Sequence, residues 1–179
     1  MTRARAAAGS AAFFVLAPGV VAGLIPWLLT GWETGERDWR VVRATGVALV
    51  AAGALVLVPA FLRFVREGVG TPAPVAPPAH LVVGGVYRLV RNPMYLAVEA
   101  VIVGQALVLG RLVLLAYAAV VGAAFAAFVR WYEEPALERR FGAEYEEYRQ
   151  AVPAWRPRLR PWEPGKGRPV GGGDSETTY

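Results

Sequence analysis

Two stretches in the first third of the chain contain no charged residue. The first covers residues 10–32 and the second covers residues 44–62. Each is close to the roughly 20 residues that a helix needs to cross the hydrocarbon core of a bilayer. A surface helix of a soluble protein alternates a polar face with an apolar one, and neither stretch does so. The pattern therefore predicts two transmembrane helices.

The first stretch could instead be a secretory signal peptide, since Arg3 and Arg5 give it a positive start. However, its apolar run is too long for a signal peptide, and it contains Pro18 and Pro26. No cleavage site of small residues lies before Trp32. We therefore favour a retained helix.

A second apolar region, residues 94–130, is too long for a single crossing. Gly110 and Arg111 divide it into two halves, each only just long enough to span. We expect a tight helical hairpin that begins at Asn92 and Pro93, because asparagine is a good N-cap and proline suits the first helical position. One long tilted helix is the alternative, but hydrophobic mismatch limits tilt.

The basic residues are distributed unevenly around these spans. With the N-terminus inside, the inner segments carry 15 of the 19 lysines and arginines, and the two outer loops carry the other four. The positive-inside rule then predicts an all-α, polytopic protein of the cell membrane, with about four transmembrane helices and both termini cytoplasmic. The net charge of +5 consequently indicates membrane lipids as partners and no nucleic acid. No obligate protein partner is evident.

Beyond Glu134, Pro135 should end or kink the fourth span, and a new helix can begin there. The apolar positions of this helix recur at helical spacing and are Leu137, Phe141, Tyr145 and Tyr148. Such a pattern is typical of an amphipathic helix in the membrane interface. A helix packed on the cytoplasmic ends of the spans would show the same pattern.

These patterns divide the chain into four regions. Residues 1–65 hold the two N-terminal spans, and residues 66–80 form a proline-rich connector that favours an extended conformation. Residues 81–162 contain the hairpin, the amphipathic helix and an extended basic segment. This segment, residues 154–162, is called the strap, and Trp155 and Trp162 are its expected anchors. We expect the glycine-rich tail, residues 163–179, to be disordered.

Two residue types that build many active sites are scarce. The chain has no cysteine, which excludes disulfides, thiolate metal sites and a cysteine nucleophile. Its single histidine, His80, cannot form a histidine-rich metal cluster, and we interpret it as a loop residue. Glu99, inside the third span, favours a wet or ligand-lined interior, because a lipid-facing carboxylate is unfavourable. A protonated or helix-paired side chain is the alternative.

Polar residues gather in two clusters, which the hairpin would bring together on the cytoplasmic side. One surrounds Asn92, and the other runs from Arg130 to Glu134. A helix N-terminus attracts a carboxylate, while Glu134 could hold an ammonium and Arg130 a second anion. The methionine part of S-adenosylmethionine has one carboxylate and one ammonium, so this pocket could accept it. An ordinary ion pair between Arg130 and Glu134, four residues apart, is the alternative.

Four sequence elements follow one another between residues 80 and 157. They are Gly85-Val86-Tyr87, Arg91-Asn92-Pro93-Met94-Tyr95, Glu133-Glu134, and Phe141-Gly142 with Tyr145 and Tyr148. In this order and spacing they resemble the C-terminal region of the isoprenylcysteine carboxyl methyltransferase and phospholipid methyltransferase families. Residues 1–65 match only as generic spans. No glycine-rich turn of the soluble methyltransferase type follows a strand-like segment.

The resemblance implies a membrane methyltransferase that uses S-adenosylmethionine and acts on a lipophilic acceptor. Cofactor contacts carried over by motif fall on Leu81, Val82, Tyr87, Asn92, Pro93, Tyr95 and Glu134, with Arg130 facing the acceptor. Many members of the family have histidine where this chain has Asn92, so we expect no base there. A carboxylate acceptor would need Arg130 for orientation, whereas an amine would need Glu134 or Glu133 for deprotonation.

Two other functions are compatible with these residues. One is a membrane reductase of the sterol-reductase type, with a nicotinamide cofactor in a similar pocket. The other is a membrane scaffold that has kept the fold without catalysis.

Overall fold

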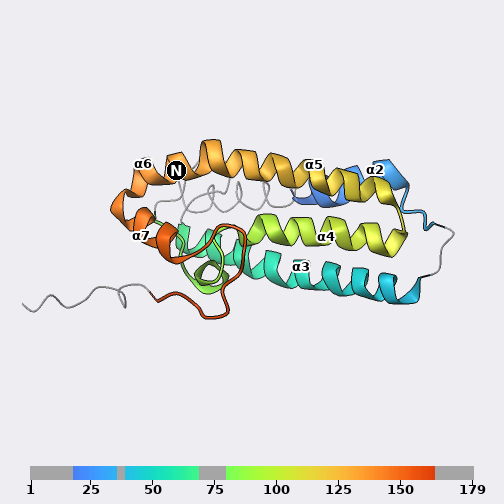
Figure 1. The fold of residues 1–179 in the computed structure, drawn as a ribbon, viewed down its shortest axis with the longest axis horizontal. Helices are drawn as coiled ribbons and strands as arrows, with labels where there is room; N and C mark the ends of the chain where they lie inside the picture. Colours follow the sequence, from blue (N-terminus) through green and yellow to red (C-terminus); the bar gives the residue numbers. More distant parts are fainter. Residues whose placement is uncertain (1–17, 36–38, 69–79, 164–179) are drawn as a thin grey trace, which may run out of the picture.

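The computed structural model describes residues 18–35, 39–68 and 80–163 (Figure 1). Within these ranges every regular element is helical, which confirms the predicted all-α class. Most of the proline-rich connector and of the tail lies outside the described residues, so the conformations expected for these two regions stay predictions.

The elements follow one another as η1 (Val20–Leu24), α2 (Ile25–Thr30), α3 (Arg40–Gly68), η2 (Gly85–Arg88), α4 (Pro93–Leu109), α5 (Leu112–Phe128), η3 (Val129–Glu133), α6 (Glu134–Phe141) and α7 (Ala143–Ala151). η1 and η3 are π-helical turns, and η2 is a 3-10 turn. Figure 1 shows α3, α4 and α5 side by side with alternating direction, and α6 and α7 together at one end. The long helices therefore form a bundle that carries α6 and α7 at one end, whereas α2 lies beside α5 toward the other end.

The predicted hairpin is present between α4 and α5. The first helix ends at Gly110, whose φ of 65° is left-handed and suits glycine. Arg111 then serves as the N-cap of α5, and its backbone N–H donates to the Ala106 oxygen at 3.1 Å. The region consists of two helices, so the alternative of one long tilted helix is wrong.

Glycines bring α3 and α4 into backbone contact. A Cβ added to Gly46 would lie 2.7 Å from the Gly104 oxygen, and a Cβ added to Gly104 would lie 2.7 Å from the Gly46 oxygen. Seven residues further along α3, a Cβ on Gly53 would lie 2.7 Å from the Ala97 oxygen. No side chain fits at these points. Small residues allow such close approach between helices in membranes.

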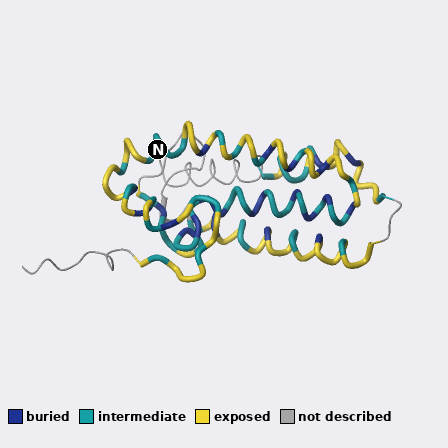
Figure 2. The backbone as a smooth tube through the Cα atoms, in the orientation of Figure 1, coloured by how far each residue is buried: buried dark blue, intermediate teal, exposed yellow. Residues whose placement is uncertain are grey.

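Two of the described helices are long and apolar enough to cross a membrane, judged by length and composition. They are Arg40–Arg63 of α3 and the continuous helix Leu112–Phe141. Val20–Thr30 and Pro93–Leu109 are apolar but shorter, so four spans stay a prediction. Figure 2 shows α4 more buried than α3, whose outer side is exposed along its length. That outer side includes large apolar residues such as Leu55, which is 75% exposed.

The helix that contains α5 does not end at Pro135. In η3 the backbone N–H of Glu134 donates to the Val129 oxygen, five residues back. Pro135 follows in the first turn of α6, where its missing N–H is tolerated. The helical hydrogen bonds thus continue past Pro135 because one π-helical turn, η3, precedes it. Such turns are frequent at functional sites.

The prediction of a single amphipathic helix beyond Pro135 is wrong, because two helices are present. Gly142, with a φ of 51°, separates α6 from α7. The predicted apolar positions nevertheless gather in one cluster, in which Tyr145 and Tyr148 are buried against Leu81 and neighbouring residues. The two short helices therefore pack on the protein itself, as the second interpretation of the pattern expected.

Candidate functional site

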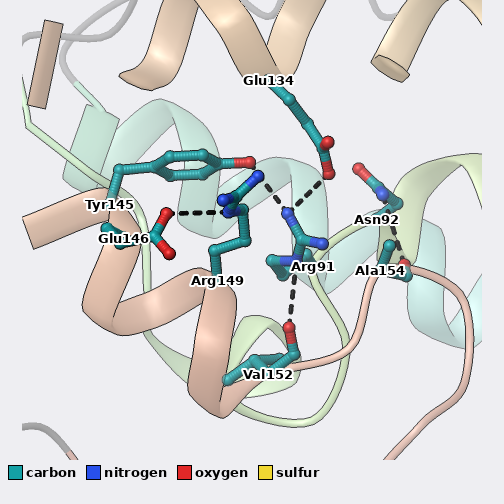
Figure 3. A network of polar contacts seen from close by, with 8 residues as sticks. All are labelled: Arg91, Asn92, Glu134, Tyr145, Glu146, Arg149, Val152 and Ala154. Carbon is teal, nitrogen blue, oxygen red and sulfur yellow. Dashed lines mark hydrogen bonds and ion pairs between the residues drawn. The ribbon is translucent and has the colours of Figure 1, made fainter. Parts of the chain in front are cut away.

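Four segments that are distant in the sequence meet at one end of the bundle. They are the segment leading into α4, the η3–α6 junction, α7, and the strap that follows α7. Figure 3 shows the polar side chains that these segments contribute. The two predicted clusters are thus brought together, as the hairpin required.

Arg91 is the centre of this polar network. Its Nη1 donates to Oε1 of Glu134 at 2.6 Å and to the Tyr145 hydroxyl at 2.8 Å (Figure 3). Its Nε donates to the Val152 oxygen at 2.9 Å, and its backbone N–H donates to the Pro153 oxygen at 3.0 Å. The side chains of Arg91 and Glu134 are only 12% and 14% exposed. One arginine therefore ties α6, α7 and the strap to the start of α4.

The strap contains no helix or strand and bends at residues 154–156 and 159–160, so it is not extended throughout as predicted. It pairs with the segment before α4 through main-chain atoms. The Arg158 N–H donates to the Leu89 oxygen, and the Trp162 N–H donates to the Arg88 oxygen, both at 2.9 Å. The Arg88 Nε also donates to the Trp162 oxygen. These bonds fix the strap's path without depending on most of its side chains.

Both tryptophans of the strap contact tyrosines of the protein. The Trp155 and Tyr95 rings are 6.4 Å apart, and the Trp162 and Tyr148 rings are 5.5 Å apart. The tryptophans therefore anchor the strap to the helices rather than leaving it free above them.

A second polar contact lies beside the arginine network. The Tyr95 hydroxyl donates to Oε2 of Glu133 at 2.8 Å, and its ring packs on Phe125 with 4.7 Å between centroids. Glu133 and Glu134 are consecutive, so their carboxylates reach two different partners from α4 and the segment before it. The motif in the sequence included Glu133 and Glu134, but their partners Tyr95 and Arg91 were not predicted.

Burial makes the phenol in the network harder to ionise. Removal of the Tyr145 side chain from water raises its pKa to about 12, against a smaller opposing effect of the Arg91 charge. The phenol, neutral at physiological pH even at its ordinary pKa, thus stays protonated to higher pH. Because its oxygen accepts a hydrogen bond from Arg91, its own proton is available to an acceptor in the site.

The N-terminus of α4 supplies free backbone donors. Asn92 is the N-cap and Pro93 the first helical residue, as predicted. The Asn92 side chain makes no capping hydrogen bond to the helix. Its Nδ2 donates to the Ala154 oxygen at 3.2 Å. The first backbone N–H of α4 to donate within the helix is that of Leu96, to the Asn92 oxygen at 3.3 Å. The N–H groups of the preceding turn lack intrahelical partners, as at every helix start, and favour an anion.

The motif-derived cofactor contacts separate into two groups. Asn92, Tyr95 and Glu134 lie in or beside the polar network. Val82 and Tyr87 are buried in a cluster with Ala60 of α3, and Leu81 packs in the cluster around Tyr145. Pro93 lines an apolar cleft. Their contacts with a cofactor stay predictions.

Arg130 does not pair with Glu134 among the described residues. It is exposed, whereas the carboxylate of Glu134 binds Arg91. The alternative of a local ion pair four residues apart is therefore wrong. The sequence did contain a signal for the true partner, because Arg91 directly precedes Asn92 and Pro93 in the motif.

Two further sequence predictions have a place in the structure. His80 is exposed outside the regular elements, as expected of a loop residue. Glu99 of α4 lies against α5, where a Cβ on Gly122 would be 3.2 Å from its Oε1. That oxygen is buried and has no hydrogen-bond partner among the described residues. The expected wet or ligand-lined interior stays a prediction.

An apolar cleft of about 240 Å³ lies between α3 and α4. Its walls come from both helices, from the segment that precedes α4, and from the strap. The lining residues are Ala52, Gly53, Val56, Val86, Leu89, Val90, Pro93, Leu96, Ala97, Ala100 and Pro157. Leu89 and Val90, which line the cleft, directly precede Arg91. The apolar cleft therefore lies next to the polar network.

One comparison with known proteins gives a match. The sequence model of the phospholipid methyltransferase family matches residues 41–144. This range runs from α3 to the start of α7 and contains the hairpin, Arg91 and both glutamates. No curated protein and no solved structure matches the chain significantly.

Proposed function

The chain belongs to the phospholipid methyltransferase family, and on this premise we propose that it transfers a methyl group from S-adenosylmethionine to a lipophilic acceptor. The family supports a membrane methyltransferase. The observation that carries the finer proposal is the position of Glu134 beside Arg91 and the N-terminus of α4.

The site offers complementary groups for the two charges of the methionine moiety. Glu134 uses Oε1 for Arg91, and its side chain remains 14% exposed, so a ligand ammonium can reach the carboxylate. The α4 N-terminus attracts a ligand carboxylate through free N–H groups and the helix dipole. When bound, the cofactor supplies a methyl group already activated by its sulfonium.

The protein's own task is then alignment and exclusion of water. Tyr95 and Glu133 hold each other at 2.8 Å, and Trp155 of the strap lies beside the Tyr95 ring. The strap thus covers one side of the α4 N-terminus. We assign Arg91 a positioning role, because it holds Glu134, Tyr145 and the strap in place.

The acceptor's hydrocarbon part fits the apolar cleft between α3 and α4. The exposed guanidinium of Arg130 is the proposed guide for an anionic head. A carboxylate acceptor then needs no base. An amine acceptor loses a proton to Glu133 or Glu134, whereas a thiol acceptor must reach the site as its thiolate.

The proposed topology has four spans, with both termini and the site on the cytoplasmic side. The basic residues support it, since 15 of the 19 lie in the segments that this topology places inside. A cofactor then enters from the cytoplasm and a lipophilic acceptor from the bilayer.

Thermal unfolding in detergent separates this proposal from the two alternatives. S-adenosylhomocysteine at about 100 times its Kd should stabilise the protein by roughly 2.7 kcal/mol, and NADPH should not. Stabilisation by NADPH alone would support the reductase, and stabilisation by neither would support a scaffold.

Transfer of labelled methyl from S-adenosylmethionine into a membrane lipid extract then identifies the acceptor class. A base-labile product indicates a methyl ester, and a base-stable product indicates an N- or S-methyl group. No labelled lipid would contradict the proposed reaction.

A further inference from the structure

The strap carries an exposed surface that the proposed reaction does not use. Leu159 at its tip is 100% exposed. Arg156 and Arg160 flank it and are exposed too. The intervening Arg158 has a structural role, because its Nη1 donates to the Ala151 oxygen at 2.7 Å. The tip thus presents one large apolar side chain between two exposed arginines.

The strap lies beside α3, near the end of its apolar stretch. Pro157 lines the same cleft as Ala52 and Val56 of α3. The apolar span of α3 ends at Arg63, so Val56 lies about 10 Å inside that end at 1.5 Å per residue. Figure 1 shows the strap folded back along the bundle at this end of α3. If α3 crosses the membrane, the strap reaches the level of the lipid headgroups or slightly deeper.

The second half of α3 also exposes large apolar side chains. Leu55 is 75% exposed, Val58 49% and Leu62 44%. Exposed apolar side chains thus occur both on this part of α3 and on the strap that packs against it through Pro157. The guanidinium groups of Arg156 and Arg160 are suited to bind lipid phosphates.

We propose that residues 156–160 dock onto the anionic lipids of the cytoplasmic leaflet. Leu159 inserts between acyl chains, and Arg156 and Arg160 bind lipid phosphates. The partner is a negatively charged bilayer surface, recognised by charge and by one apolar contact. This docking is independent of methyl transfer, because it uses neither the polar network nor a cofactor.

The absence of cysteine makes a direct test possible. In Leu159→Cys, a polarity-sensitive fluorophore reports the tip's surroundings in nanodiscs of phosphatidylcholine with or without phosphatidylglycerol. The matched control is Glu147→Cys, at an exposed position of α7 outside the strap. We expect nitroxide-bearing lipid to quench the tip label, and aqueous iodide to quench the control label. Both sites are exposed, so neither substitution should disturb folding.

The charge dependence is tested in the same labelled protein. At ~1 kcal/mol for each arginine near an anionic surface, the two together should favour the docked tip about thirty-fold in anionic over neutral bilayers. The double variant Arg156→Gln/Arg160→Gln should lose this preference. Equal iodide quenching of both labels in both bilayers would overturn the proposal. Lipid quenching without any dependence on phosphatidylglycerol would overturn the anionic partner.

Discussion

Two parts of α4 are held in place by different kinds of contact. Around Gly104, α4 packs against α3 so closely that neither Gly104 nor Gly46 has room for a Cβ. Its N-terminal end meets α6, α7 and the strap through charged and hydrogen-bonded side chains centred on Arg91. The first contact is apolar and leaves no room for a side chain between the two backbones. The second consists of polar groups and includes backbone N–H groups without intrahelical partners. One helix therefore contributes both to the packing of the bundle and to the candidate site.

The largest effect should follow from removing the centre of the polar end. Arg91→Ala leaves the buried Tyr145 and the largely buried Glu134 without their donor and releases the Val152 oxygen. Loss of one partner of a buried pair costs ~3 kcal/mol or more. We expect a lower unfolding temperature in detergent and loss of S-adenosylhomocysteine binding. Parent-like stability and affinity together would show that the network is dispensable.

The second prediction separates binding from folding at the same end. Glu134→Gln keeps an oxygen that can accept from Arg91 but removes the charge that would hold an ammonium. The cofactor should bind with about 1.5–3 kcal/mol less free energy, which is roughly ten- to a hundred-fold in affinity. Calorimetric titration with S-adenosylhomocysteine measures it, beside an unfolding curve that should barely move. Unchanged affinity would remove Glu134 from the cofactor site.

The third prediction concerns the apolar contact. Gly104→Ala places a Cβ against the Gly46 oxygen and the Val50 side chain, so α3 and α4 must separate. We expect a loss of about 1–3 kcal/mol in stability, as for other overpacked sites. Unfolding in detergent measures it against Gly23→Ala, because a Cβ on Gly23 would meet no atom within 4 Å. Equal stability of the two variants would mean that the glycine contact does not hold the bundle.

The smallest effect on binding should come from Arg130. Arg130 is exposed and unpaired among the described residues, so Arg130→Ala should change cofactor affinity by less than ~0.5 kcal/mol. Turnover should fall if the guanidinium guides the acceptor. Lysine is a poor control, since it keeps the charge but loses the planar fork. A large loss of S-adenosylhomocysteine affinity would instead place Arg130 in the cofactor site.

The sequence predicted the parts of the fold that depend on local pattern. The charge-free run 44–62 predicted α3, and Gly110 predicted the turn of the hairpin, because both effects act within one segment. The run 10–32 lies partly outside the described residues, and its described part is the shorter helical stretch Val20–Thr30. The break at Gly142 escaped prediction, since the apolar positions on either side kept helical spacing and one glycine can be tolerated in a helix. The contact between Gly46 and Gly104 also escaped, although the seven-residue spacing of Gly46 and Gly53 places both on one face of α3.

The meeting of the two polar clusters was predicted, but the pairing within them was not. The α4 N-terminus and Glu134 do come together, because the hairpin fixes their level. Arg130 was the local candidate for Glu134, since side chains four residues apart share a helix face. The actual partner, Arg91, is 43 residues away and depends on how the hairpin, α6 and the strap are arranged. Tertiary arrangement of this kind leaves no periodic signal in one sequence.

The way the strap is bound also affects how the protein can evolve. Its path is fixed largely by main-chain bonds to Arg88, Leu89 and Arg91, which do not depend on the identity of the strap's residues. Substitutions at exposed positions such as Leu159 can therefore accumulate without loosening the strap. Natural variation at its tip can therefore change the proposed membrane contact without altering the polar network around Arg91.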